Sequence, residues 1–232
     1  MCTVTFLPLA KNGFILTSSR DESPLRETIA PNNYVENGVK MCFPKDKLAG
    51  GTWIGTSSKK RLVCVLNGAF ENHIKKDNYS KSRGVIAKEI LKEKNAIEFI
   101  KNINLEGVEP FTLVLVDWSN EVGLYELIWD EKTKFFSKLK NEPNIWSSST
   151  LYSNKIKELR KNWFQNWLAK NTFSTKTILE FHHSEIGDKQ QSVLMKRSTV
   201  ETVSITSVKK EGAVIEMNYN DVIHSKNTTL VV

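Results

Sequence analysis

Residues 3–18 read TVTFLPLAKNGFILTS, with an apolar run on each side of Asn12-Gly13. An Asn-Gly pair between apolar runs is the strongest short-range signal for a β-hairpin, because both residues tolerate the positive φ angles of a tight turn. The same signal recurs at Asn37-Gly38, between Tyr34–Val35 and Val39–Phe43. The chain is therefore expected to begin with antiparallel hairpins.

Further along the chain, the spacing of apolar residues changes between helical and extended patterns. From Arg83 to Ile103 it is helical, which predicts two helices that break near Asn95. Asn154–Lys170 and Ser174–His182 predict two more helices. The remaining apolar runs predict strands at Leu62–Leu66, Phe111–Val116, Val122–Trp129, Ser192–Met195, Val200–Val208, Ala213–Tyr219 and Val222–His224.

This order of elements predicts the fold class. Strands, helices, strands, helices and strands follow one another in groups, whereas a doubly wound α/β fold alternates single strands with helices. We expect an α+β fold, a four-layer αββα sandwich of two antiparallel sheets between helix layers, as one domain over residues 1–232. Continuously apolar strands such as Leu62–Leu66 fit sheets that are covered on both faces.

The amino-acid composition limits the classes of protein to which this chain can belong. The 232 residues are 40% hydrophobic and 25% charged, which is typical of a globular protein. No apolar run reaches the roughly 18 residues of a membrane helix, and no signal peptide is evident, so no stable membrane insertion is expected. The net charge of +7 comes from dispersed lysines, so we expect no nucleic-acid partner.

The three cysteines form no C-x-x-C pair, which argues against a disulfide framework or a zinc ribbon. A reducing cytoplasm is the simplest location. The four histidines are scattered along the chain and are expected to be core or surface residues, so no metal and no cofactor is predicted.

Cys2 is notable for its position. If Met1 is removed, the thiol and the new α-amino group belong to one residue. An α-amine has a pKa of about 7.7–8.0, so it can accept the thiol proton near neutral pH and activate the nucleophile. With only Met1 before it in this sequence, methionine removal alone is the expected activation step. The alternative is that Cys2 opens a strand as a small hydrophobic residue.

Two further sites carry polar groups suited to such chemistry. Arg20-Asp21 follows the first hairpin, which returns the chain towards its own beginning. There a carboxylate can orient an amine and a guanidinium can favour a thiolate. Asn67 ends an apolar strand and offers a neutral amide donor to an oxyanion. The structural alternatives are a surface salt bridge for Arg20-Asp21 and an ordinary Asn-Gly turn at Asn67-Gly68.

Four segments occur together in one order: MCTVTF at 1–6, SSRDE at 18–22, GGTWIG at 50–55 and RLVCVLN at 61–67. This combination resembles the NRDE family, also called transport and Golgi organisation protein 2-like. That family in turn resembles the cysteine N-terminal nucleophile (Ntn) hydrolases, which cleave or transfer amide-linked acyl groups. Weaker matches across the rest of the chain are KSRGVIA at 81–87, PFTLVLVD at 110–117, WSSSTLYS at 146–153 and KRSTVETV at 196–203.

The resemblance implies roles for individual residues. Cys2 is the implied nucleophile with its own amine as base, flanked by Arg20 and Asp21, and Asn67 is the implied oxyanion donor. Arg197 is a weaker match to a late arginine of the superfamily.

The sequence departs from the family pattern at two positions. Ser19 replaces the first residue of Asn-Arg-Asp-Glu, and Ser149 replaces an asparagine that the superfamily often uses to support the site. A serine hydroxyl still donates a hydrogen bond, but over a shorter reach, and Ser149 is retained as a substrate-binding candidate. Trp53, after paired glycines, is expected either to line an acyl pocket or to fill the core.

Two functions follow from these residues. The first is an N-terminal-cysteine amidohydrolase or acyltransferase acting on a small non-peptide acyl amide. The alternative is a non-catalytic protein that binds an acyl-CoA, a lipid or a haem-like ligand and keeps the Ntn fold. The acyl group, the amine and the oligomeric state are left open by the sequence.

Overall fold

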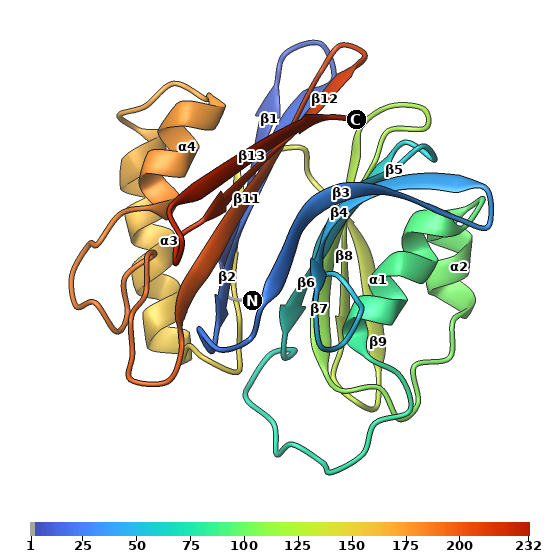
Figure 1. Cartoon of the computed structure of the whole chain (residues 1–232), viewed down its shortest axis with the longest axis horizontal. Helices are drawn as coiled ribbons and strands as arrows, with labels where there is room; N and C mark the ends of the chain where they lie inside the picture. Colours follow the sequence, from blue (N-terminus) through green and yellow to red (C-terminus); the bar gives the residue numbers. More distant parts are fainter. Residues whose placement is uncertain (1–2) are drawn as a thin grey trace. The chain divides into compact units, whose positions relative to one another are not determined.

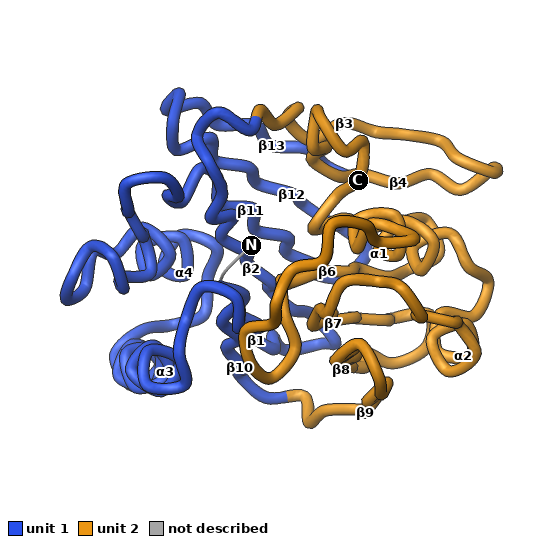
Figure 2. Tube along the Cα trace, turned by 90° about the horizontal axis from the view of Figure 1, so that it is seen from below, with its two compact units in different colours: residues 1–26, 142–232 blue, residues 27–141 orange. Residues whose placement is uncertain are grey.

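The computed structural model describes residues 3–232. The chain forms two compact units (Figure 2). Unit 1 combines the chain up to Arg26 with Glu142–Val232, and unit 2 is the continuous segment Glu27–Asn141. The single domain expected over residues 1–232 stays a prediction.

Unit 1 is a six-stranded antiparallel sheet with two helices against it (Figure 1). Its helices are α3 (Asn154–Leu168) and α4 (Thr175–His182). In sheet order its strands are β10 (Asn144–Ser147), β1 (Thr3–Leu9), β2 (Gly13–Glu22), β11 (Glu201–Glu211), β12 (Val214–Asp221) and β13 (Lys226–Val231).

The core of unit 1 lies between its sheet and its helices. Leu7 of β1 and Ile15 of β2 pack with Phe164 of α3 and with Ile178 and Phe181 of α4. Side chains of a strand alternate between the two faces of its sheet, so the odd-numbered residues of β1 and β2 point to the helices. This alternation sets which polar residues share that face further along the same strands.

Unit 2 is a seven-stranded antiparallel sheet with its own two helices, α1 (Arg83–Lys92) and α2 (Ala96–Asn102). Helix α1 packs against β5 and β6, and Asn95 caps the N-terminus of α2. In sheet order the strands are β3 (Thr28–Glu36), β4 (Val39–Asp46), β5 (Ile54–Ser57), β6 (Arg61–Asn67), β7 (Phe111–Asp117), β8 (Gly123–Trp129) and β9 (Lys134–Leu139).

Both predicted hairpins are confirmed, with different turn residues. At Asn37-Gly38 both residues have positive φ, 52° and 75°, and the flanking Glu36 and Val39 are paired. In the first hairpin the positive angles fall one residue earlier, on Lys11 and Asn12. Gly13 is needed for another reason: a Cβ there would lie 2.9 Å from the carbonyl oxygen of Lys210 on β11.

The glycines of Gly50-Gly51-Thr52-Trp53 have separate structural uses. Gly50 adopts a φ of +68°. Gly51 lies against Gly84 at the start of α1, where a Cβ on Gly51 would be 3.1 Å from the Gly84 backbone. A Cβ on Gly84 would in turn be 3.0 Å from the backbone N and O of Thr52. These two glycines allow helix α1 to approach its sheet closely.

Two predicted strands are wrong. Ser192–Met195 forms no strand, although Val193 and Met195 are buried. The Leu194 N–H donates to the Ser184 carbonyl in a loop, and the Met195 carbonyl accepts from the Thr202 N–H of β11 at 2.8 Å. Val222–His224 is a turn closed by Asp221, whose Oδ1 accepts from the His224 N–H at 2.9 Å. The last strand, β13, lies beyond that turn.

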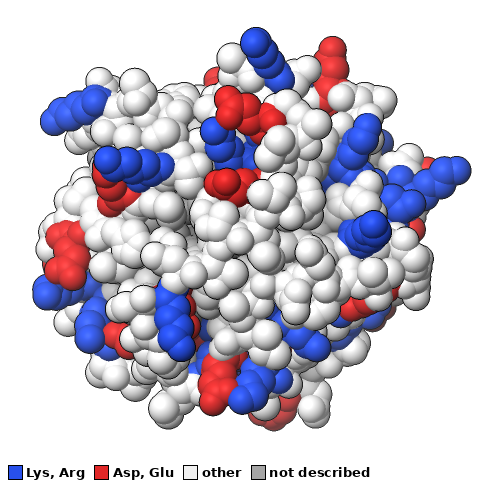
Figure 3. Space-filling model, turned by 45° about the horizontal axis from the view of Figure 1, so that its top comes forward, with Lys and Arg blue, Asp and Glu red and all other residues white. Residues whose placement is uncertain are grey.

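Charged side chains of both signs are interspersed on the face drawn in Figure 3. Several lysines pair with carboxylates, as in Lys92–Glu36 at 3.1 Å and Lys81–Glu89 at 2.8 Å. No helix within residues 3–232 is long and apolar enough to cross a membrane.

Candidate active site

Asp21 is a buried carboxylate near the end of β2, and two hydroxyl groups fix its orientation. The Tyr152 hydroxyl donates to Oδ2 at 2.8 Å, and the Thr202 hydroxyl donates to Oδ1 at 2.6 Å. Each carboxylate oxygen therefore accepts one of these hydrogen bonds, at ordinary O–H···O distances. Such an arrangement can hold and orient a nearby cation or amine.

A β-bulge places Thr202 beside Asp21. Strands β2 and β11 pair antiparallel, and their register shifts between Thr202 and Ser204. A bulge inserts one extra residue into one strand and re-aims the side chains next to it, and bulges are common beside active sites. Here Thr202 comes opposite Asp21, and Ser204 comes opposite Arg20.

Arg20 is also buried, and it points to the other face of the sheet. Ser19 bonds to His182 of helix α4 and so faces the helices, which places Asp21 on the same face and Arg20 on the opposite one. Arg20 donates from Nη1 to the carbonyl oxygen of Arg26 at 3.3 Å. Both members of Arg20-Asp21 thus lie inside a buried strand, so the alternative of a surface turn with a salt bridge is wrong.

Two arginines surround the ring of Tyr152. The Arg160 guanidinium lies 3.6 Å from the ring centroid, and that of Arg197 lies 5.3 Å from it. Arg197 also donates from Nη2 to the Leu151 carbonyl at 3.1 Å. The late arginine expected from the family resemblance is therefore connected to Asp21 through Tyr152.

Ser149 lies in the same unit, just before α3. Its hydroxyl is buried and accepts a hydrogen bond from the Lys157 ammonium group at 2.7 Å. The neighbouring Ser148 hydroxyl is 3.0 Å from that of Thr150. Ser149 thus holds a lysine of α3, a contact that the sequence does not indicate.

His182 is a buried histidine at the end of α4 that bridges the two first strands. Its Nδ1 is 2.8 Å from the Ser19 hydroxyl, and its Nε2 is 2.9 Å from the Thr5 hydroxyl. Complete burial, with smaller contributions from His183 and Arg160, lowers the pKa of His182 from 6.5 to about 3. The ring is therefore neutral at physiological pH and connects a helix to the strand that carries Arg20 and Asp21.

Asn67 and Trp53 belong to unit 2. Asn67 is the last residue of β6, half-buried and paired with Phe111 of β7. Trp53 is buried, and its carbonyl accepts from the Val65 N–H at 2.8 Å. Four expected site residues, Arg20, Asp21, Ser149 and Arg197, thus share unit 1, and Cys2 lies outside the described residues.

Tyr152, Thr202, Arg160 and His182 were not expected in the site. Tyr152 and Thr202 lie in the segments WSSSTLYS and KRSTVETV, which carry part of the family resemblance. That was the only sequence signal for them, because they approach Asp21 across 131 and 181 residues of chain. Within residues 3–232, no group of three or more His, Cys, Asp or Glu side chains could hold a metal ion.

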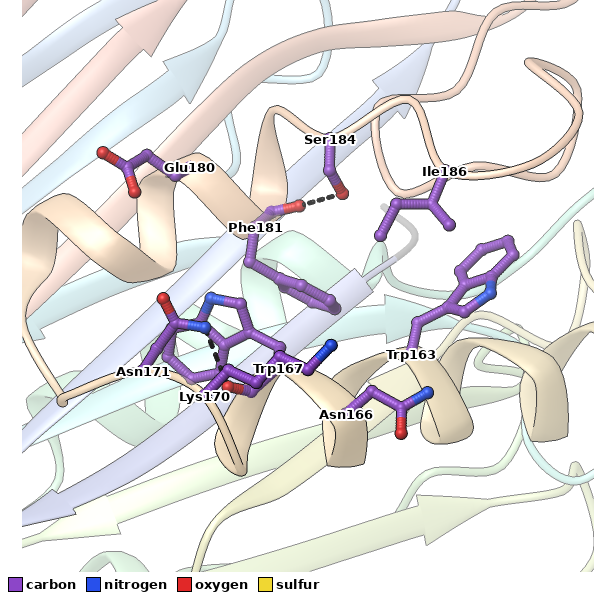
Figure 4. Close-up of a pocket in the computed structure, with 9 residues that line it drawn as sticks. All are labelled: Trp163, Asn166, Trp167, Lys170, Asn171, Glu180, Phe181, Ser184 and Ile186. Carbon is purple, nitrogen blue, oxygen red and sulfur yellow. Dashed lines mark hydrogen bonds between the residues drawn. The ribbon is translucent and has the colours of Figure 1, made fainter.

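A separate open pocket of about 380 Å³ lies between α3, α4 and the loop that follows α4 (Figure 4). Trp163 and Trp167 of α3 are only partly buried and line this pocket, whereas Phe164 is in the core. None of the expected site residues lines this pocket. Its lining is Trp163, Asn166, Trp167, Lys170, Asn171, Glu180, Phe181, Ser184 and Ile186.

The fold is that of the Ntn hydrolases. The chain is similar to the N-acylethanolamine-hydrolyzing acid amidase ortholog of Caenorhabditis elegans, with a TM-score of 0.65 and 12% identity over 100% of both chains. It is similar to a variant of conjugated bile acid hydrolase from Clostridium perfringens, with a TM-score of 0.59 and 8% identity over 99% of this chain and 92% of that one. Penicillin V acylase from Agrobacterium tumefaciens gives a TM-score of 0.55 and 9% identity over 100% of this chain and 86% of that one. The predicted Ntn-hydrolase-like α+β fold is confirmed.

Residues 1–225 match the family Transport and Golgi organisation 2, and the chain belongs to this family. A curated relative, the Transport and Golgi organization 2 homolog of Mus musculus, is 26% identical over 139 residues. That alignment covers 53% of this chain and 48% of the mouse protein, so it spans about half the length of the relative. The family resemblance deduced from the sequence is therefore confirmed.

Proposed function

We propose that this chain is an N-terminal-cysteine amidohydrolase or acyltransferase that acts on a small, non-peptide acyl amide. The observation that carries the proposal is the buried carboxylate of Asp21 on β2, the strand that pairs with β1. The hydroxyl groups of Tyr152 and Thr202 hold this carboxylate by hydrogen bonds. Thr3 of β1 pairs with Ser19, next to Arg20-Asp21, and Cys2 is bonded to Thr3. The fold shared with three amide hydrolases supports the same chemistry.

In the proposed mechanism, Cys2 is the nucleophile once Met1 is removed. Its α-amine takes the thiol proton, and the thiolate attacks the amide carbonyl to form a tetrahedral intermediate. We assign Arg20 and Asp21 to the charge balance at the thiol and amine and Ser149 to a substrate contact, while the oxyanion role of Asn67 and the substrate contact of Trp53 stay predictions from the sequence. The protonated amine returns its proton to the leaving nitrogen, the C–N bond breaks, and water or another acceptor then releases the acyl group from sulfur.

We place this activity in the cytoplasm. Cys42 and Cys64 are buried cysteines, and burial raises the pKa of the Cys42 thiol to about 11. A catalytic thiolate is compatible with a reducing compartment.

The first test is the intact mass of the protein, which shows whether Met1 has been removed. The processed protein is then incubated with an N-acylethanolamine, a conjugated bile acid and penicillin V, and the released amine is measured. We expect turnover of at least one acyl amide, and loss of that turnover to the background rate in Cys2→Ala. Cys64→Ala is the matched control, because it removes a thiol from β6 and is expected to keep the activity.

The same experiment distinguishes the proposed amidohydrolase from the non-catalytic alternative. Retention of Met1, or tight binding of an acyl ligand that survives Cys2→Ala without turnover, would overturn the hydrolase proposal and favour a ligand carrier. Turnover that is unchanged in Cys2→Ala would assign the chemistry to another group.

A further inference from the structure

Arg160 of helix α3 is a fully buried cation. Its Nε donates to the Gln191 carbonyl at 3.0 Å, its Nη1 donates to the Thr3 hydroxyl at 2.5 Å, and its Nη2 donates to the Ser192 carbonyl. Among residues 3–232 no carboxylate lies within ion-pair distance of it. Burying a charge without a counter-ion is costly, and neutral hydrogen bonds offset only part of that cost. The molecule thus keeps beneath β1 a buried positive charge that neutral groups hold in place.

This guanidinium contacts both parts of the candidate site in unit 1. On one side it bonds to Thr3, the residue that follows Cys2 in the chain. On the other side its Cζ atom lies 3.6 Å from the centroid of the Tyr152 ring, and the Tyr152 hydroxyl donates to Asp21. A single side chain therefore fixes the beginning of β1 and the phenol that orients Asp21.

We propose that Arg160 is a positioning residue of the thiol site: it holds the chain at Thr3 against Tyr152 and Asp21, and its charge favours the thiolate form of Cys2. The proposal rests on the assignment of Cys2 as nucleophile. A positive charge near a thiol favours its deprotonated form, and a buried charge is screened less by salt than an exposed one. Arg160 acts through Thr3 and Tyr152 and is not assigned any contact with substrate.

The test measures the reactivity of the Cys2 thiol directly. Cys2 in the full chain is alkylated with iodoacetamide over a range of pH, and the N-terminal peptide is quantified by mass spectrometry, which separates Cys2 from Cys42 and Cys64. Arg160→Met is expected to raise the apparent pKa of the Cys2 thiol by about one unit, which slows its alkylation at pH 7 by about ten-fold. Arg160→Lys keeps the charge and is expected to restore most of the shift.

Lys161→Met is the matched control, because it removes an exposed cation from the next residue of the same helix. An unchanged thiol pKa in Arg160→Met, or an equal shift in Lys161→Met, would overturn the proposal. The alkylation rate needs no substrate, so this result is independent of whether the protein hydrolyses an amide.

A second variant covers the case in which Arg160→Met does not fold. Thr3→Val removes the acceptor of the Arg160 bond and leaves the charge in place. We expect faster hydrogen exchange of the backbone amides in the first half of β1 and unchanged exchange in β12. Unchanged exchange in β1 would contradict the positioning role.

Discussion

The buried His182 predicts a specific loss of stability in mild acid. Its pKa is lowered to about 3 in the folded protein, against 6.5 as its ordinary value, so below pH 6.5 the unfolded chain binds a proton that the folded protein does not. Stability is therefore complete above pH 6.5 and falls as the pH is lowered towards 3. Between pH 7 and pH 5 these two pKa values correspond to a loss of about 2 kcal/mol in the free energy of unfolding.

The assay is urea denaturation followed by tryptophan fluorescence at pH 7 and pH 5, on the parent chain and on His182→Gln. Gln cannot titrate, so the difference between the two pH values is expected to shrink by about 2 kcal/mol in the variant. His183→Gln, at the exposed neighbouring position, is the control and is expected to keep the full difference. Other ionisable groups are common to all three proteins and cancel in the comparison. An equal loss of stability in parent and His182→Gln would refute the reasoning.

Three further substitutions test single buried positions, and the free energy of unfolding of each variant is measured by urea denaturation at pH 7. The Thr206 hydroxyl on β11 is buried without a hydrogen-bond partner among the described residues, so Thr206→Val is expected to be neutral or stabilising by up to about 1 kcal/mol. Thr202→Val, on the same strand, removes a hydrogen bond to Asp21 and is expected to lower the free energy of unfolding by about 1–3 kcal/mol. Equal effects of Thr206→Val and Thr202→Val would contradict the hydrogen bonding described for the two hydroxyl groups. Gly84→Ala would push a methyl group into the backbone of Thr52 and is expected to cost about 1–3 kcal/mol, and a loss below about 0.5 kcal/mol would show that α1 can shift without strain.

Local chemistry accounts for the parts of the fold that the sequence predicts. The hairpin at Asn37-Gly38 and the helix break at Asn95 depend on residues that are neighbours in the chain. Three of the strands that were not predicted, β9, β10 and β13, lie at sheet edges. Edge strands are often short, polar or lysine-bearing, so their hydrophobic pattern is weak. The opposite error, at Ser192–Met195, comes from apolar residues that fill the core without joining a sheet.

The candidate site was predicted only in part, for a related reason. Arg20 and Asp21 follow from their place after the first hairpin and from the family resemblance. The residues around them could not be predicted in the same way, because Tyr152, Thr202 and Arg160 reach the site through strand pairing and packing over more than a hundred residues of chain. No periodic pattern in the sequence records such contacts.

The division of the chain into an interrupted unit 1 and a continuous unit 2 determines when each can be completed during synthesis. Unit 2 has all its strands once Asn141 has been made. Strand β2, which carries Arg20 and Asp21, pairs with β1 along one edge, but its other edge stays open until β11 is made, whose first residue is Glu201. Non-local pairing of this kind is slow to form, and an unpaired strand is open to aggregation until its partner arrives. A nascent chain that stops before Glu201 therefore keeps every strand of unit 2 but lacks β11, the strand that borders Asp21.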